Sequence, residues 1–148
     1  MLEHDHSVVV EFLDGQGLGN QLWNWASGLS IAKRSGRNLL VLNQENFKGR
    51  NFLSLKNTTY IKSLPKNVTH YHEKNYFNKK MKYIDSGYDE IPEKITGDIK
   101  ITGIFQDERY LEEDILDNLV MRSRPNVIPG LCILNIRGGE YKRKKLFN

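Results

Sequence analysis

The 148-residue sequence contains one cysteine, Cys132, and this scarcity excludes two ways of stabilising a fold. A single cysteine forms neither an internal disulfide framework nor a zinc site built from cysteines. Because Cys132 lies within an apolar run, we expect it to be a small buried hydrophobic residue. The length allows one domain with its own core, and 39% of the residues are hydrophobic.

The sequence also has no apolar run near the ~20 residues that a membrane-spanning helix needs. Residues 1–6 lack the basic and then apolar regions of a secretory signal peptide. These absences predict a cytoplasmic protein, and they are compatible with peripheral association with a membrane. The formal net charge is +4, which allows a polyanionic partner without requiring one.

Histidine occurs in two pairs, but the pattern predicts no metal site. His4 and His6, like His70 and His72, are two residues apart. On a strand this spacing places both imidazoles of a pair on one face. No third ligand with a fitting spacing follows either pair, so we expect exposed polar positions and no metal.

The glycine-rich stretch from Gly15 to Asn20 follows an apolar run and precedes a helical pattern. Its alternating glycines allow left-handed backbone angles and a close approach to a ligand. A helix beginning at about Asn20 would direct unpaired N–H groups across this turn, which favours an anion such as a phosphate. The spacing fits neither G-x-G-x-x-G nor a P-loop, so a tight turn without a ligand is an equal alternative.

The same region predicts the first unit of a parallel α/β sheet. Apolar residues at positions 22, 25, 26, 29 and 32 recur at helical spacing, and Gly36 is placed to end that helix. Apolar runs at 7–13 and 38–42 predict strands on either side of the helix. Together they predict a βαβ unit.

The middle of the chain predicts fewer regular elements. We expect residues 44–67 to form a loop with one short helix, because their apolar residues follow no clean period. Residues 68–72 and 98–105 are expected to be strands, and residues 73–94 an irregular connector.

The last third predicts one more helix and one more strand. Asp107 is placed to cap a helix that Arg122 and Arg124 would close. The apolar stripe of this helix would be Leu111, Ile115, Leu119 and Val120. After a turn at Pro129-Gly130, residues 131–136 predict a buried strand.

Two stretches resemble motifs of one enzyme family. Residues 17–23, G-L-G-N-Q-L-W, resemble the G-L-G-N-Q-L-F opening of the alpha-1,2-fucosyltransferases, glycosyltransferase family 11. Residues 103–111, G-I-F-Q-D-E-R-Y-L, resemble the G-Y-F-Q-S-E-K-Y-F block of the same family. This chain has Gln16 for a glycine, Ile104 for a tyrosine and Arg109 for a lysine.

A third stretch, residues 135–141 with the sequence N-I-R-G-G-E-Y, resembles H-x-R-R-G-D-Y. Alpha-1,2-, alpha-1,6- and protein O-fucosyltransferases share that block. Its first arginine contacts the diphosphate of GDP-fucose, and the resemblance gives this catalytic role to Arg137, whose guanidinium would stabilise the departing GDP. Asn135 replaces the histidine, Gly138 the second arginine and Glu140 the aspartate.

The resemblance implies a Rossmann-like parallel sheet flanked by helices, the N-terminal half of a two-domain GT-B glycosyltransferase. Residues 1–130 would form the acceptor-side domain and residues 131–148 the start of the donor-binding domain. The implied partners are GDP-fucose and a galactoside glycan acceptor, with no cofactor or metal requirement. We expect this chain alone to transfer little or no fucose. Donor-binding residues by resemblance are Gly17, Gly19, Asn20, Gln21, Asn135, Arg137, Gly139 and Glu140, with Glu140 orienting Arg137.

Two other classes of function stay open. Four basic residues at 142–145, with basic and aromatic residues interleaved at 75–83, suit a small basic nucleic-acid-binding module. No further nucleic-acid motif accompanies them, so we expect no nucleic-acid partner. The other alternative is a folded remnant kept as an interaction domain. Salt-dependent binding to RNA or DNA would favour the module, and GDP binding lost in Arg137→Ala would favour the transferase.

Overall fold

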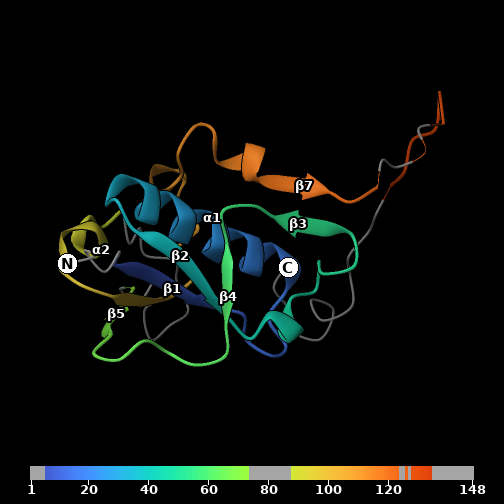
Figure 1. The fold of residues 1–148 in the computed structure, drawn as a ribbon. Helices are drawn as coiled ribbons and strands as arrows, with labels where there is room; N and C mark the ends of the chain where they lie inside the picture. Colours follow the sequence, from blue (N-terminus) through green and yellow to red (C-terminus); the bar gives the residue numbers. More distant parts are fainter. Residues whose placement is uncertain (1–5, 74–87, 124–125, 127, 135–148) are drawn as a thin grey trace, which may run out of the picture.

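A five-stranded parallel sheet forms the centre of the computed structural model (Figure 1). The structure describes residues 6–73, 88–123, 126 and 128–134, and every structural statement below refers to these. The strands lie in the order β4-β2-β1-β6-β5, and all neighbours are parallel. Their bounds are Ser7–Glu11 (β1), Asn38–Leu42 (β2), Thr59–Ile61 (β4), Thr69–His72 (β5) and Ile99–Thr102 (β6). This confirms the predicted α/β class and is compatible with a Rossmann-like fold.

The helix α1, Leu18–Arg34, follows β1 and packs against both β1 and β2. It begins at Leu18 rather than near Asn20, and Gly36 follows its end with a φ of +64°, as a terminating glycine should. Gly28 allows the helix to approach the sheet, because a Cβ there would lie 2.5 Å from Val10 Cγ1. The predicted βαβ unit is therefore confirmed.

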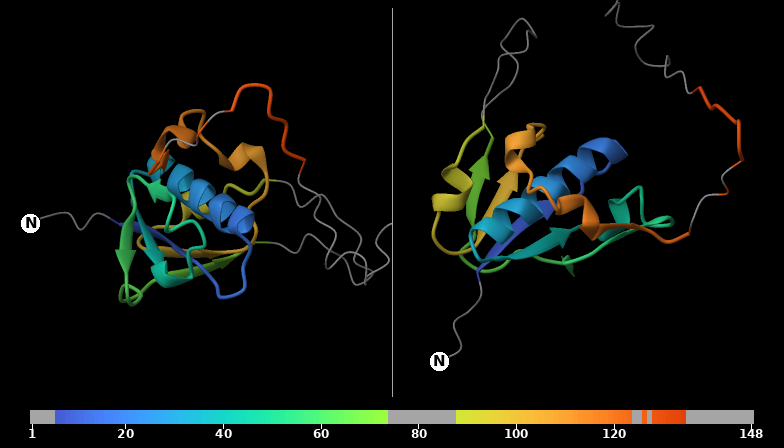
Figure 2. Two further views of the ribbon diagram at one scale, coloured as in Figure 1. Left: turned by 90° about the vertical axis from the view of Figure 1, so that its right-hand side faces the viewer. Right: turned by 90° about the horizontal axis from the view of Figure 1, so that it is seen from above.

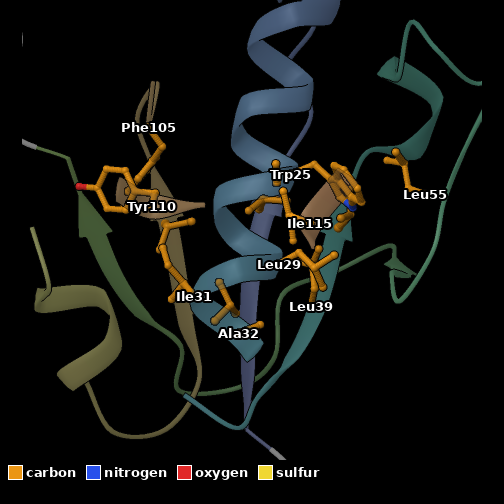
Figure 3. Packing of buried hydrophobic residues seen from close by; sticks show 14 of the residues in the cluster. Trp25, Leu29, Ile31, Ala32, Leu39, Leu55, Phe105, Tyr110 and Ile115 are labelled. Atoms are coloured by element: carbon orange, nitrogen blue, oxygen red, sulfur yellow. The ribbon is translucent and has the colours of Figure 1, made fainter. Parts of the chain in front are cut away.

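The hydrophobic core lies between α1 and the sheet. Figure 3 shows Trp25 and Leu29 of α1 beside Leu39 of β2, while Ile31 points toward Phe105 and Tyr110. Successive residues of a strand face opposite sides, so this face takes every second strand residue. The other face carries the buried Val9 and Leu42 together with polar side chains such as the Lys100–Glu11 ion pair.

The chain after β6 crosses the same side of the sheet as α1 (Figure 2). It forms two 3-10 turns that contact α1, η2 (Glu108–Tyr110) and η3 (Ile115–Asn118). It then forms β7 (Leu119–Met121), which pairs antiparallel with β3 (Leu53–Leu55). The short helix α2 (Ile91–Lys94) also contacts α1, so both described α-helices lie on one side.

The helix predicted after Asp107 is wrong. Asp107 does act as a cap, since its carboxylate accepts a hydrogen bond from the Arg109 N–H at 2.9 Å, but two separate 3-10 turns follow in place of an α-helix. The backbone then leaves the helical path because the Glu112 N–H donates to Ser30 Oγ of α1 at 3.0 Å. Tertiary contacts with α1 therefore override the local helical pattern.

The predicted loop at 44–67 is wrong in part. It contains the expected short helix, as the 3-10 turn η1 (Gln44–Asn46), but also β3 and β4. Both strands are three residues long and are defined by pairing, β3 with β7 and β4 with β2. Such short strands leave no alternating pattern in the sequence.

The buried strand predicted at 131–136 is also wrong for its described part. Residues 131–134 form no strand, and Ile133 and Leu134 are each 81% exposed. Cys132, predicted to be buried, is exposed. An apolar run becomes a strand only when its backbone groups find partners, and no described strand pairs with this one. Residues 135 and 136 lie outside the described residues.

Candidate functional site

The central feature of the site is the junction between β1 and β6. From β1 the sheet continues to β2 and β4 on one side and to β6 and β5 on the other. This reversal is a topological switch point, where open α/β sheets bind ligands at the carboxyl ends of their strands. A cavity of about 30 Å³ lies there. We call it the switch-point crevice; it is lined by Val10, Glu11, Leu13, Asn24, Ile101, Thr102 and Gly103.

The glycine turn lies beside this crevice, between β1 and α1. Gly15 takes a φ of +74°, which a residue with a side chain rarely adopts. Gly17 is the extended N-cap of α1, so it needs no left-handed backbone. A Cβ at Gly17 or Gly19 would meet nothing within 4 Å. The fold itself does not require glycine at these two positions, which leave open space at the start of α1.

Asn20 and Gln106 join the turn to the loop that follows β6. Gln106 Nε2 donates a hydrogen bond to Asn20 Oδ1 at 2.6 Å, across 86 positions of sequence. Both residues are close to solvent, and both belong to the stretches singled out in the sequence. The fold therefore brings the first and second motif blocks together at the carboxyl edge of the sheet.

The loop at residues 103–106 has an unusual backbone. Phe105, only 1% exposed, has a φ of +47°, a conformation that costs a bulky residue about 1–3 kcal/mol. Ser27 Oγ donates to its carbonyl at 3.1 Å. Glu73 Oε2 accepts from the backbone N–H groups of Ile104 and Phe105 at 2.7 and 2.8 Å. The surrounding structure thus holds a strained loop in the position from which Gln106 reaches Asn20.

We call the two hydrogen bonds from the Ile104 and Phe105 N–H groups to Glu73 the Glu73 clamp, and Gly103 makes it possible. A Cβ at Gly103 would lie 2.4 Å from Glu73 Oε2, closer than atoms can approach. Glycine is therefore needed here for close packing. Neither Glu73 nor Ser27 was singled out from the sequence, because no local pattern links them to the loop.

Two aromatic rings, Tyr71 and Tyr110, pack against Phe105 of this loop. The Phe105 ring lies between those of Tyr71 and Tyr110, at centroid distances of 6.3 and 5.1 Å. Burial raises the pKa of Tyr110 to about 12. Burial and a hydrogen bond to Asp89 also raise the pKa of Tyr71. Both hydroxyls are therefore neutral at neutral pH.

Gln21, a predicted donor-binding residue, is not among the residues that line the switch-point crevice. It is fully buried, with an exposed fraction of 0%. Its Nε2 donates to the Asn46 carbonyl at 2.8 Å, and its Oε1 accepts from the Lys48 N–H at 3.0 Å. Gln21 therefore fixes the loop after β2.

Glu11 and Asn24, two polar residues that line the switch-point crevice, differ in their hydrogen bonding. Glu11 accepts from Asn43 Nδ2 at 2.8 Å and pairs with Lys100 Nζ at 2.5 Å. Asn24 is 8% exposed, and its Oδ1 has no hydrogen-bond partner among the described residues. The sequence held no signal for Asn24, because it lies away from the apolar stripe predicted for α1, one turn after Asn20.

The remaining predicted site residues cannot be placed. Asn135, Arg137, Gly139 and Glu140 lie outside the described residues, as do the basic residues at 142–145. Gly17, Gly19 and Asn20 are the predicted donor-binding residues that the structure brings to the carboxyl edge.

The described part of the chain has another hollow that could hold a ligand, and no metal-binding cluster. It contains no group of three His, Cys, Asp or Glu residues able to hold a metal ion. None of its helices is long and apolar enough to cross a membrane. A larger hollow of about 420 Å³ lies at the ends of β2 and β4, beside Asn43, Tyr60 and Lys62. It contains no residue of the three motif blocks.

Comparison with models of protein families, with curated proteins and with solved structures finds no match. An assignment of function therefore depends on the geometry of the carboxyl edge and on the motifs in the sequence.

Proposed function

We propose that this chain is part of a glycosyltransferase that transfers fucose from GDP-fucose to a galactoside. The observation that carries the proposal is the hydrogen bond between Gln106 and Asn20. It supports the idea that the first two motif blocks, far apart in sequence, serve one site. That site lies at the switch point of a parallel sheet, where ligand binding is expected.

The start of α1 suits the diphosphate of the donor. Unpaired N–H groups and the helix dipole favour an anion at a helix N-terminus. The first turn of α1 has no acidic side chain to oppose one. The open space at Gly17 and Gly19 gives a phosphate access to the backbone.

The chemistry needs a positive charge on the leaving-group side. As fucose is transferred, the bond between its anomeric carbon and the β-phosphate oxygen breaks, and the electron pair leaves with GDP. The acceptor hydroxyl oxygen forms the new glycosidic bond, and its proton passes to solvent water. Arg137, from the third motif block, is proposed to bind the diphosphate and stabilise its growing charge, with Glu140 orienting it.

Calorimetric titration of the purified chain with GDP and GDP-fucose tests the proposal. We expect saturable binding that weakens at least tenfold in Asn20→Ala and in Arg137→Ala. Lys56→Ala is the charge-matched control, because it removes an exposed lysine far in sequence from the three blocks. The same purified chain is also assayed for fucose transfer, which we expect to be little or none.

The absence of GDP binding, or a loss in Lys56→Ala as large as that in Arg137→Ala, would contradict the proposal. Equal losses in these two charge-removing variants, with none in the neutral change Asn20→Ala, would mean that binding follows the overall positive charge. In that case steep salt dependence and binding to RNA would identify a nucleic-acid-binding module instead.

A further inference from the structure

Two buried asparagines differ in one respect. Asn24 and Asn118 are both 8% exposed. The Asn118 carboxamide is satisfied: Oδ1 accepts from Asn57 Nδ2 at 2.6 Å, and Nδ2 donates to the Ile115 carbonyl at 3.3 Å. Asn24 Oδ1 has no such partner among the described residues. Buried polar groups are normally paired, so this exception requires an explanation.

The position of Asn24 points to a ligand. Asn24 lines the switch-point crevice, on the α1 side, opposite Thr102 and Gly103 at the end of β6. A strained loop that begins at Gly103 forms the neighbouring wall. Strained backbone of this kind gathers at ligand sites, where the surrounding structure maintains it.

The size and charge of the crevice limit what it can bind. Its volume of about 30 Å³ is enough for one water-sized group and too small for a phosphate. None of its described lining residues is positively charged, and Glu11 contributes a carboxylate. A neutral group that both donates and accepts hydrogen bonds fits best, and a hydroxyl is such a group.

We propose that Asn24 recognises one hydroxyl group of a neutral sugar ring in the switch-point crevice. Because Oδ1 is closed to solvent in the free chain, the Asn24 carboxamide turns toward the crevice to exchange hydrogen bonds with that hydroxyl. Asn20 lies one turn earlier on α1, about 6 Å along the helix axis, a span that one sugar ring covers. The diphosphate thus belongs at the Gly17–Asn20 end and a sugar hydroxyl at the Asn24 end.

The identity of the sugar rests on the proposed function, which supplies two sources of such a hydroxyl. One is the fucose of the donor, and the other is the galactoside acceptor. The unaltered chain and Asn24→Ala are therefore titrated with GDP, GDP-fucose and methyl β-galactoside. Asn118→Ala is the matched control, an asparagine of equal burial outside the crevice.

We expect Asn24→Ala to bind GDP unchanged and to lose about tenfold in affinity for one sugar probe, as expected for one hydrogen bond. Loss of the preference for GDP-fucose over GDP identifies the donor sugar. Loss of galactoside binding identifies the acceptor. Asn118→Ala is expected to lower the melting temperature and leave the sugar affinities unchanged. Asn24→Leu, which fills the crevice, is the second variant in case Asn24→Ala folds poorly.

The subsite is overturned if the unaltered chain binds GDP-fucose no more tightly than GDP and does not bind methyl β-galactoside. It is also overturned if Asn24→Ala and Asn24→Leu match the unaltered chain. GDP binding in either case leaves the proposed function standing. Conversely, galactoside binding lost in Asn24→Ala, with no binding of GDP, overturns the proposed function and keeps the subsite.

Discussion

The βαβ unit at residues 7–42 and the returning segment at residues 103–121 are stabilised in different ways. In the βαβ unit, Val8, Val10 and Ile31 are at most 1% exposed, so burial of apolar surface is the main contribution. The returning segment consists of two 3-10 turns and one short strand. It buries only single side chains in the core, Phe105, Tyr110 and Ile115, and its path between them is set by hydrogen bonds and ion pairs to α1. The first region forms a scaffold, and the second takes its shape from the side chains that this scaffold presents.

The carboxyl-edge site lies where the two regions meet. Gln106 belongs to the returning segment and Asn20 to the βαβ unit, and their hydrogen bond joins the two. Arg34, at the other end of α1, donates to the Tyr110 carbonyl at 2.9 Å and pairs with Glu112. The segment is therefore anchored near both ends of the helix.

The largest effect is expected in the scaffold, from Trp25→Ala. Trp25 is 1% exposed, and its Nε1 donates to Thr58 Oγ1 at 2.9 Å. Removing a buried tryptophan should lower the free energy of unfolding by about 3–5 kcal/mol. Urea denaturation followed by circular dichroism measures this loss. Trp25→Phe keeps most of the ring volume and should lose markedly less; an equal loss would show that packing is not the main contribution.

A smaller effect is expected from Arg34→Ala, which acts on the returning segment. The side chain is 23% exposed and bonds to Glu93, Glu112 and the Tyr110 carbonyl. Burial alone would lower the pKa of Arg34, but the hydrogen bonds to Glu93 and Glu112 outweigh it and the pKa is raised. We expect a loss of about 2 kcal/mol in urea denaturation.

Lys33→Ala provides the comparison for Arg34→Ala. Lys33 makes an ion pair with Asp114 at 2.7 Å, but both side chains are well exposed. Solvent screening makes such pairs weak, so the loss should be clearly smaller than that of Arg34→Ala. Equal losses would contradict the view that burial makes the Arg34 contacts strong.

The smallest effect on stability is expected from lowering the pH. Hydrogen bonds from Arg109 lower the pKa of Asp107, and one from Lys33 lowers the pKa of Asp114. A carboxyl group with a lowered folded-state pKa adds stability above its unfolded pKa of 3.8, and this is lost as pH falls through the folded value. The urea midpoint should therefore drop below about pH 4. The urea midpoint of Asp107→Asn, whose side-chain amide does not titrate in this range, should fall less than that of the unaltered chain. An equal fall would contradict a contribution from the Asp107 carboxylate.

The scaffold was predictable because the sequence pattern within each of its segments indicates the secondary structure of that segment. The strand at 38–42 matches its predicted bounds, and the helix ends before Gly36 as expected. The path of the returning segment was not predictable. Leu111, Ile115 and Leu119 have the spacing of a helix, but contacts with α1 prevent the segment from forming one. Ser30 and Arg34 of α1 decide the path of this segment, and only the folded chain brings them close to it.

The candidate site shows the same division. Gly17, Gly19 and Asn20 follow from the glycine turn and its resemblance to a known motif. The Gln106–Asn20 bond, the Glu73 clamp and the strained Phe105 depend on contacts between distant segments, so no local pattern predicts them. Gln21 stays a predicted donor-binding residue from the motif, and its burial was not predictable because it depends on contacts with the loop after β2.

The most direct test of the account is an NMR titration of the isotope-labelled chain with GDP-fucose, following the side-chain amide signals. We expect saturable shifts for Asn20, Asn24 and Gln106. We expect none for Asn118, which is as buried as Asn24. The absence of shifts in the first three, or shifts confined to Asn43 and Gln44 at the larger hollow, would contradict a sugar-nucleotide site at the switch point.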